Sequence, residues 1–347
     1  MSRRFLIALL ICSTLPAFAA RRRATVPRDV YPPCSIVTGT AAVTFTRDDG
    51  RFLARSTEPR KPIAYTYGLA AMLDEPDTLM AWHNNDLLVS TDGGCAWRVV
   101  ATIEGWDFPP KLEPARGGRV YAWAENRLFF VRYDARGAVK LKPPVEFVGV
   151  GVDAENGDRV RAGGADGTLW ESLDAGESWT QFGRLTGAPL FYRFTFDPRN
   201  LDHIVAGTVT TGAHVTFDGG RNWSRASGVG AMANVFNLIM SPVDPNRVWA
   251  MGIDLSDSGR HIFVSDDGGV TYRIVITEAP GVKLINGPIM AAHPVHRDVL
   301  YFAFGTHVFD YGSDLFRFDL ATNTLTMTHS DHDGINAITF SRRNPSV

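Results

Sequence analysis

The sequence predicts an all-β protein built from one repeating unit rather than from several unlike domains. The 347 residues include 33 Gly, 20 Pro and 21 Phe, and this mixture of turn formers and aromatic residues is typical of many short strands. A short turn motif also returns several times along the chain. Such repeats take precedence over the usual expectation of about one domain per 150 residues.

Composition and charge exclude several classes of protein. Hydrophobic residues make up 45% of the chain and charged residues 21%, which is ordinary for a folded globular protein and argues against disorder. The formal net charge is −2, so we expect no nucleic-acid partner. The sequence has no Gly-rich phosphate loop, no H-E-x-x-H and no G-x-S-x-G. We therefore expect no cofactor and no metal.

Residues 1–20 have the parts of a signal peptide. Two arginines precede a short apolar run from Phe5 to Leu15, and Ala17-Phe18-Ala19 fits the rule for cleavage after small residues. The apolar run is far shorter than the roughly 20 residues of a membrane-spanning helix. We expect a secreted or periplasmic protein with no membrane span in the mature chain; an uncleaved anchor is the alternative. Residues 21–33 follow as a basic, Pro-rich lead-in.

Five octets share the pattern S/T-x-D-x-G and divide the chain into units of similar length. Four of them end in an aromatic residue, and the fifth ends in Leu53. The aspartates at positions 48 and 92 are 44 residues apart, as are those at positions 174 and 218. In such a turn Asp caps backbone N–H groups, and Gly takes a left-handed conformation. The residues expected to do this structural work are Asp48, Asp92, Trp97, Asp174, Trp179, Asp218, Trp223, Asp267 and Tyr272.

These octets resemble the Asp-box, or bacterial neuraminidase repeat, of sialidases, sortilin-type receptors, xyloglucanases and photosystem II assembly factors. The resemblance implies a β-propeller in which the octet is the turn between the third and fourth strands of a blade, with its aromatic residue packed between blades. A second repeated element, a Pro-Asp turn followed by an apolar strand, resembles the turn between the first and second strands.

We name the strands of a blade A to D from the inside out. For a seventh blade we expect Cys34–Gly39 as strand B, Ala41–Thr46 as strand C, Phe52–Ser56 as strand D and Ile335–Phe340 as strand A. The predicted fold is a single seven-bladed β-propeller over residues 34–347, closed by pairing of the C-terminal strand A with the N-terminal strands B–D. Six or eight blades are the alternatives. The six complete blades are expected over residues 65–104, 110–146, 147–183, 190–227, 234–277 and 286–328.

Two cysteines, Cys34 and Cys95, remain after signal cleavage. Export would place them in an oxidising compartment. In a propeller the A–B and C–D turns share one face, which brings the start of the closing strand B near the C–D turn of the next blade. We therefore expect a Cys34–Cys95 disulfide, and two free thiols are the alternative. The disulfide would contribute on the order of 4 kcal/mol on the loop-entropy model.

The opposite face, formed by the B–C and D–A connections, is the functional face in the propellers that the chain resembles. We call it the mouth face. Trp106 and Tyr311 would serve there as platforms for a sugar or a peptide. The alternative is that these loops are merely polar. The residues expected to bind a ligand are His83, Asn84, Trp106, Asp107, His214, His261, His307, Tyr311, His329 and His332.

We favour an exported, noncatalytic, monomeric propeller that binds a protein or carbohydrate partner at the mouth face; an adhesion or envelope-assembly role is of the same kind. The alternative is a glycoside hydrolase similar to xyloglucanases or sialidases. The Arg-Ile-Pro signature of sialidases is absent, and one propeller lacks the second wall of a xyloglucanase cleft. A glycosidase needs two carboxyl groups about 5–9.5 Å apart. The candidates on the mouth face are Asp107, Asp254, Asp257, Asp310 and Asp331.

Overall fold

The computed structural model describes residues 31–39, 43–48, 50–57, 66–104, 109–228, 232–284, 289–304, 313–331 and 334–345, which all belong to one compact unit, Tyr31–Val347. None of these residues lies in a helix, and this part of the chain accordingly offers no helical segment that could cross a membrane. The predicted signal peptide and most of the lead-in lie outside the described residues.

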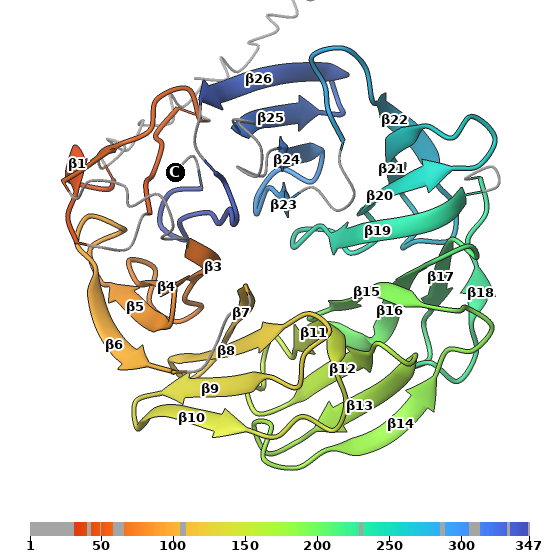
Figure 1. The fold of residues 1–347 in the computed structure, drawn as a ribbon, viewed down its shortest axis with the longest axis horizontal. Coiled ribbons are helices and arrows are strands. Elements are labelled where there is room, and N and C mark those ends of the chain that lie inside the picture. Colours follow the sequence, from red (N-terminus) through yellow and green to blue (C-terminus); the bar gives the residue numbers. More distant parts are fainter. Residues whose placement is uncertain are drawn as a thin grey trace, which may run out of the picture. The chain divides into compact units, whose positions relative to one another are not determined.

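Six antiparallel four-stranded sheets form most of the unit, and the first strands of successive sheets contact one another around its centre (Figure 1). This is the architecture of a β-propeller, so the prediction of an all-β propeller with six complete blades is confirmed. The blades are β3–β6 (Thr66–Ala71, Leu79–His83, Asp86–Ser90, Arg98–Thr102), β7–β10 (Pro110–Ala115, Arg119–Ala124, Phe130–Asp134, Gly137–Leu141), β11–β14 (Phe147–Val152, Val160–Gly164, Thr168–Ser172, Thr180–Arg184), β15–β18 (Phe191–Asp197, Asn200–Thr208, Ala213–Thr216, Ser224–Arg225), β19–β22 (Met232–Met240, Val248–Asp254, Arg260–Ser265, Arg273–Thr277) and β23–β26 (Ile289–Ala292, Val299–Phe304, Ser313–Asp319, Thr324–Asp331).

The two ends of the unit differ from the prediction. β1 (Ile36–Val37) pairs in parallel with β2 (Arg55–Ser56), the expected strand D. The prediction that Cys34–Gly39 forms strand B is therefore wrong, because strand B would pair antiparallel with strands A and C. Residues 334–345 contain no assigned strand, so the expected strand A over Ile335–Phe340 is not formed as a hydrogen-bonded strand.

The reason for this difference is a set of bonds between the N-terminal segment and the first blade. Cys34 and Cys95 are joined by a disulfide, with a Cα–Cα distance of 5.9 Å. The Thr38 N–H donates to the Cys95 carbonyl at 2.7 Å, and the Trp97 N–H donates to the Thr38 carbonyl at 3.2 Å. These bonds hold the segment against the turn between β5 and β6, where it lies beside β2 instead of between two strands.

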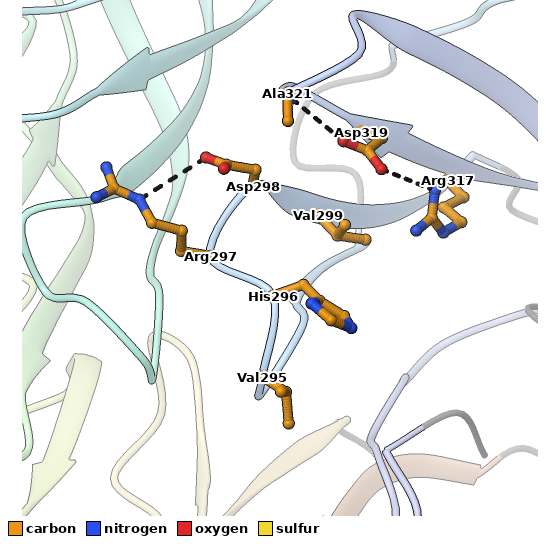
Figure 2. Close-up of a pocket in the computed structure, with 8 residues that line it drawn as sticks. All are labelled: Val295, His296, Arg297, Asp298, Val299, Arg317, Asp319 and Ala321. Atoms are coloured by element: carbon orange, nitrogen blue, oxygen red, sulfur yellow. Dashed lines mark hydrogen bonds and ion pairs between the residues drawn. The ribbon is translucent and has the colours of Figure 1, made fainter. Parts of the chain in front are cut away.

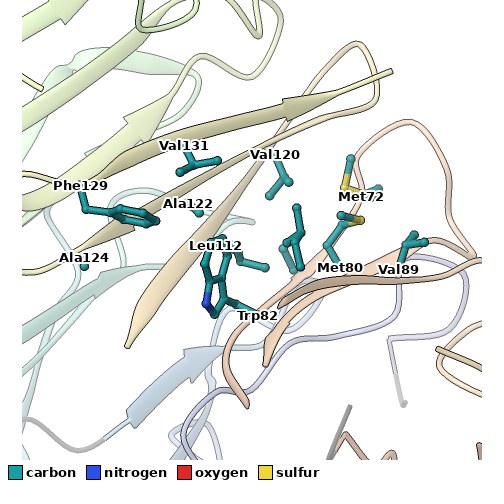
Figure 3. Packing of buried hydrophobic residues seen from close by; sticks show 12 residues of the cluster. Met72, Met80, Trp82, Val89, Leu112, Val120, Ala122, Ala124, Phe129 and Val131 are labelled. Carbon is teal, nitrogen blue, oxygen red and sulfur yellow. The ribbon is translucent and has the colours of Figure 1, made fainter. Parts of the chain in front are cut away.

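The core lies between neighbouring blades, as the contact of the first and second blades illustrates (Figure 3). Met80 and Trp82 of β4 face Val120 of β8 and Phe129, and all four side chains are buried. The Trp82 and Phe129 rings meet edge to face at 5.7 Å. Because blades cover both faces of β4, every residue of this strand is buried, and the strand is a nearly continuous apolar run.

Five turns share one hydrogen-bond pattern, and we call them the Asp turns. In each, the Ser or Thr hydroxyl donates to the Asp carboxylate at 2.7–2.8 Å and accepts the N–H of the Gly at 2.7–3.0 Å. The same carboxylate oxygen accepts the backbone N–H four residues after the Asp at 2.8–3.0 Å. The hydroxyl therefore links the carboxylate to the Gly backbone, a role that the sequence did not reveal. The aspartates are Asp48, Asp92, Asp174, Asp218 and Asp267.

Aromatic residues at the ends of the octets pack beneath their own turns. Nε1–H of Trp97 donates to the Gly94 carbonyl at 3.0 Å, and Nε1–H of Trp179 donates to the Gly176 carbonyl at 3.1 Å. The Trp179 ring also lies 5.4 Å from Phe130 in the second blade and 5.2 Å from Phe147 in the third. Trp179 thus joins two blades. Trp223 lies 6.4 Å from Phe194 in its own blade, and Tyr272 is buried.

Glycines on the third blade allow the fourth blade to approach closely. A Cβ on Gly149 of β11 would lie 2.1 Å from the carbonyl oxygen of Phe194 on β15. A Cβ on Gly163 of β12 would lie 2.2 Å from the Phe194 ring. Only residues without a side chain fit at these positions, so Phe194 and its neighbours in β15 are held against β11.

Gly149→Ala should destabilise the protein by about 1–3 kcal/mol, because the added methyl group meets backbone that has no room to move. Urea unfolding measures the loss. Gly183→Ala is the control, since a Cβ there would lie 3.3 Å from its nearest neighbours, and it should cost clearly less. Equal stability of the two variants would show that the blades are not packed this closely.

Asp174 tests the Asp turns through the pH dependence of stability. Hydrogen bonds from the Ser178 side chain and backbone lower the pKa of Asp174 to about 2. A carboxylate with a lowered pKa stabilises the fold above its unfolded pKa of about 4, and this contribution is lost as the pH falls toward the folded value. Asp174→Asn should therefore reduce stability at neutral pH and flatten the loss at acid pH in urea unfolding. Glu155→Gln, with a side chain that is 84% exposed, should leave the curve unchanged.

Candidate functional site

Several predicted mouth-face residues lie outside the described part of the chain. His329 is half-buried on β26, and Asp331 is the last residue of that strand. His83, Asn84, His214, Asp254, Asp257 and His261 are described in full. Those outside the described residues are Trp106, Asp107, His307, Asp310, Tyr311 and His332.

Two predicted histidines are buried inside their blades. His83 is 6% exposed, and its Nδ1 lies 3.1 Å from Oγ1 of Thr66, its cross-strand partner. His261 is 2% exposed, and its Nδ1 lies 3.0 Å from Oγ1 of Thr277, which also faces it across the sheet. The expectation that these rings stand on the loop surface is wrong, because strand pairing turns each toward a Thr. Asn84, which follows His83, is exposed.

The two candidate carboxylates that the structure describes in full, Asp254 and Asp257, both accept hydrogen bonds from within their own loop. Asp254 is 5% exposed and accepts the N–H and the hydroxyl of Ser256, both at 2.8 Å. Asp257 accepts the Gly259 N–H at 2.6 Å and lies 3.2 Å from Nε2 of His261. These bonds, that of Gly259 foremost, lower the pKa of Asp257. A lowered pKa does not suit the proton donor of a glycosidase.

His214 on β17 is half-buried, and its ring contacts the loop that precedes its strand. Its Nε2 lies 3.1 Å from Oγ1 of Thr211. Burial, and next the nearby Arg225 cation, lower the pKa of His214, so the neutral ring is favoured.

A charged cluster that no sequence motif marks lies at the mouth-face ends of two blades. We call it the inner cluster; it consists of Lys111 and Glu113 on β7, Trp123 on β8, Glu125 just after β8, and Arg193 on β15. Oε1 of Glu125 accepts from Nζ of Lys111 and, at 2.7 Å, from Nη1 of Arg193. Both cations lie over the Trp123 ring, 5.5 and 5.6 Å from its centroid. Trp123 in turn donates its Nε1–H to Glu113 at 3.4 Å.

Burial gives the inner cluster unusual electrostatics. Burial, reinforced by Arg193, lowers the pKa of Lys111 to about 8, although 35% of its side chain stays exposed. Burial also raises the pKa of Glu113. Burial alone would raise the pKa of Glu125 too, but Lys111 and Arg193 together lower it. The pKa values of the two carboxyl groups are therefore shifted in opposite directions.

The amino-acid sequence carries only a weak signal for this cluster. Lys111 and Glu113 alternate with buried Pro110 and Leu112, as in any strand with one exposed side. Arg193 is 68 residues from Glu125, so their contact depends on the fold. One signal was available: β7 and β15 contain charged residues, whereas the inner strands β3, β11, β19 and β23 contain none.

The sixth blade has a hollow at its end opposite the mouth face, and the charges that line this hollow are balanced (Figure 2). Arg297 lies beside Asp298, with Nε and Oδ1 3.7 Å apart, and Nη1 of Arg317 lies 3.5 Å from Asp319. These pairs leave no surplus charge for an ionic ligand. The hollow is lined by Val295, His296, Arg297, Asp298, Val299, Arg317, Asp319 and Ala321.

Comparison with known proteins shows one strong similarity in sequence. No protein-family model matches the chain. The chain is 45% identical over 330 residues to the dispase autolysis-inducing protein of Streptomyces mobaraensis, and the alignment covers 91% of this chain and 87% of that protein.

Solved structures show the same fold at low identity. The GH74 enzyme of Niastella koreensis aligns with a TM-score of 0.57 at 15% identity, over 73% of this chain and 39% of the enzyme. An ancestral GH74 enzyme aligns with a TM-score of 0.52 at 14% identity, over 75% of this chain and 37% of the enzyme. The chain thus spans about two fifths of the length of these enzymes, and the likeness is one of fold alone.

Glu113→Gln tests the electrostatics of the inner cluster. Because the folded pKa of Glu113 is raised above its unfolded value, the ionised form costs stability once the pH exceeds the unfolded pKa. The variant removes this cost, so thermal unfolding should show it to be more stable than the wild type at about pH 8 and no more stable at about pH 4. Loss of stability at the higher pH would show that attraction to the cations outweighs burial.

Proposed function

Because the chain belongs to the family of the dispase autolysis-inducing protein, we propose that it binds a dispase-type protease and promotes the autolysis of that protease. The proposed role is noncatalytic: the propeller supplies a binding surface, and the protease makes the cut in itself. The similarity to the Streptomyces protein carries this proposal, because it extends over nearly the whole chain and not over a single blade.

The inner cluster is the proposed centre of the binding surface. Taking charged groups out of water costs free energy, and a paired set of buried charges seldom adds to stability. Four other inner strands do without charged residues, so the propeller does not need them there. Charges that the fold does not need, beside a large aromatic ring, are typical of a recognition site.

The proposed site of action is outside the cytoplasm, after removal of residues 1–20. The disulfide between Cys34 and Cys95 supports this location, because disulfides persist mainly in oxidising compartments. A protease partner that digests itself would meet the propeller in the same secreted or periplasmic space.

A seventh blade, with the octets as Asp-box repeats, is the proposed complete form of the ring. The hydrogen-bond pattern shared by the five Asp turns supports the repeat. Gly50, in the first Asp turn, lies against Leu315 and Thr328 of the sixth blade, since a Cβ there would approach each to 2.8 Å. Phe45, from the same hairpin, packs with the core of the first blade. These contacts support a blade between the sixth and the first.

Contacts of the C-terminal segment support the same closure. Phe340 lies 5.4 Å from Tyr301 of the sixth blade, ring centre to ring centre. Arg343 pairs with Asp77 of the first blade and lies over the Tyr31 ring at 5.5 Å. Arg-Asp pairs also join successive blades elsewhere in the ring, so Arg343–Asp77 extends a series. The other pairs are Arg119–Asp158, Arg161–Asp202 and Arg247–Asp298.

Mixing the mature chain with dispase tests the proposed function. Loss of intact dispase on gels, and of its activity, should be faster with the chain than without it. The double variant Lys111→Met and Arg193→Met should need roughly tenfold more protein for the same rate, because it removes both cations of the inner cluster. Lys140→Met on the outer strand β10 is the charge-matched control.

Two outcomes of this experiment would contradict the proposal. An unchanged rate of autolysis in the presence of the wild-type chain would overturn the function. Full activity of the double variant would instead remove the inner cluster from the binding surface. Thermal unfolding of each variant shows whether a lost effect reflects a lost fold.

A further inference from the structure

The inner cluster has a specific chemistry, and we propose that it binds a carboxylate group on an acidic segment of the protein partner, which takes the place of Glu125 between Lys111 and Arg193. The inference rests on the proposed function, because it names what a protein partner would present to this site. It follows from three features of the cluster: a replaceable internal carboxylate, spare donor capacity, and an apolar neighbourhood.

Glu125 is the group that a partner carboxylate would replace. It follows the end of β8, where the chain turns toward β9, and 39% of its side chain is exposed. The cations it contacts are fixed more firmly, because Lys111 and Arg193 belong to inner strands and lie over the buried Trp123 ring. Glu125 can therefore turn outward, while the two cations stay in position for another carboxylate.

The two cations have more donor capacity than Glu125 uses. A guanidinium and an ammonium group each carry several N–H donors, and both here share a single oxygen of Glu125. Nε of Arg193 is also buried, with no hydrogen-bond partner in the described structure. A second carboxylate oxygen could accept from the remaining N–H donors of the guanidinium and ammonium groups, and charge-assisted bonds of this kind are among the stronger ones in proteins.

The charge balance of the cluster points the same way. Lys111 and Arg193 both donate to Glu125, whereas Glu113 accepts from the indole N–H of Trp123. Glu125 is therefore the carboxylate that directly bonds the two cations. When Glu125 turns away, an acidic group from outside restores the balance, whereas a neutral or basic group leaves two cations unpaired at a partly desolvated site.

Aromatic side chains beside Arg193 favour a peptide over a small free anion. Tyr192 of β15 and Phe236 of β19 lie with their ring centroids 4.9 Å apart, and both side chains are half-buried. Tyr192 directly precedes Arg193 on β15, so this half-buried pair contributes partly exposed aromatic surface one residue along the strand from Arg193. The residues that flank an acidic side chain in a polypeptide would cover this surface, and a free carboxylate ion would not.

Peptide binding to the mature chain tests the inference directly. The probes are a short peptide with two adjacent Glu residues between alanines and the same peptide with Gln in their place, titrated calorimetrically. The Glu peptide should bind about tenfold more tightly than the Gln peptide. Lys111→Met and Arg193→Met should each weaken its binding by a similar factor. Lys140→Met should leave the Kd unchanged.

Glu125→Gln is the more discriminating variant, because the proposal predicts that it binds the Glu peptide more tightly than the wild type does. Removal of the internal competitor should tighten binding of the Glu peptide by several-fold, about as much as one partly exposed charge contact is worth. A misfolded protein would not produce such a gain. Glu155→Gln, which removes an exposed carboxylate elsewhere, should leave the Kd unchanged.

The results separate this inference from the proposed function. If the chain accelerates dispase autolysis but Glu125→Gln binds the Glu peptide no better than the wild type, the carboxylate site is overturned and the function stands. If the peptide binds to the wild type and the variants as expected but autolysis is not accelerated, the carboxylate-binding site is supported and the proposed function is wrong. Tighter binding of an oligosaccharide of uronic acids than of the Glu peptide would overturn the choice of a protein segment.

Discussion

Face-to-face packing of neighbouring blades is the constraint on which the rest of this structure depends. Each blade is covered on both sides, so its second strand is largely buried, as all of β4 and β12 is, and a charge there needs partners, as Arg161 of β12 has in Glu171 and Asp202. The Asp turns serve the same packing, since their glycines and aromatic residues lie against adjoining strands. Charged residues of the third strand β9 are paired in the same way, as Arg132 and Asp134 are with each other. Four of the six inner strands contain no charged residue, so the charges on β7 and β15 are exceptional among the inner strands.

The repeated turns of the fold could be predicted because the hydrogen bonds that form each turn join residues close together in the sequence. Asp174 and its equivalents bond only within their own octet, so the turn is readable from eight residues. The chain ends could not be read in this way. The Cys34–Cys95 disulfide across 61 residues was predicted, but the parallel pairing of Ile36–Val37 with Arg55–Ser56, which replaces the expected strand B, was not, because no local motif records it.

The candidate site was harder to predict because residue type alone does not show how a side chain is used. Histidine and aspartate on mouth loops suggested binding, yet His261 faces Thr277 inside its sheet, and Asp254 holds Ser256 of its own loop. Conversely, Lys111 followed the in-and-out pattern of an ordinary strand. Its importance depends on Arg193, which only the ring brings near.

The inner cluster also depends on the absence of side chains in the blade between its two halves. Glu125 belongs to the second blade and Arg193 to the fourth, so their contact crosses the end of the third. Gly149 leaves no side chain where Phe194, the neighbour of Arg193, meets β11. A larger residue at position 149 would push β15 outward and lengthen the path from Arg193 to Glu125. The glycines that allow tight packing of the blades thus also set the spacing of the charges, which makes the site a consequence of the core.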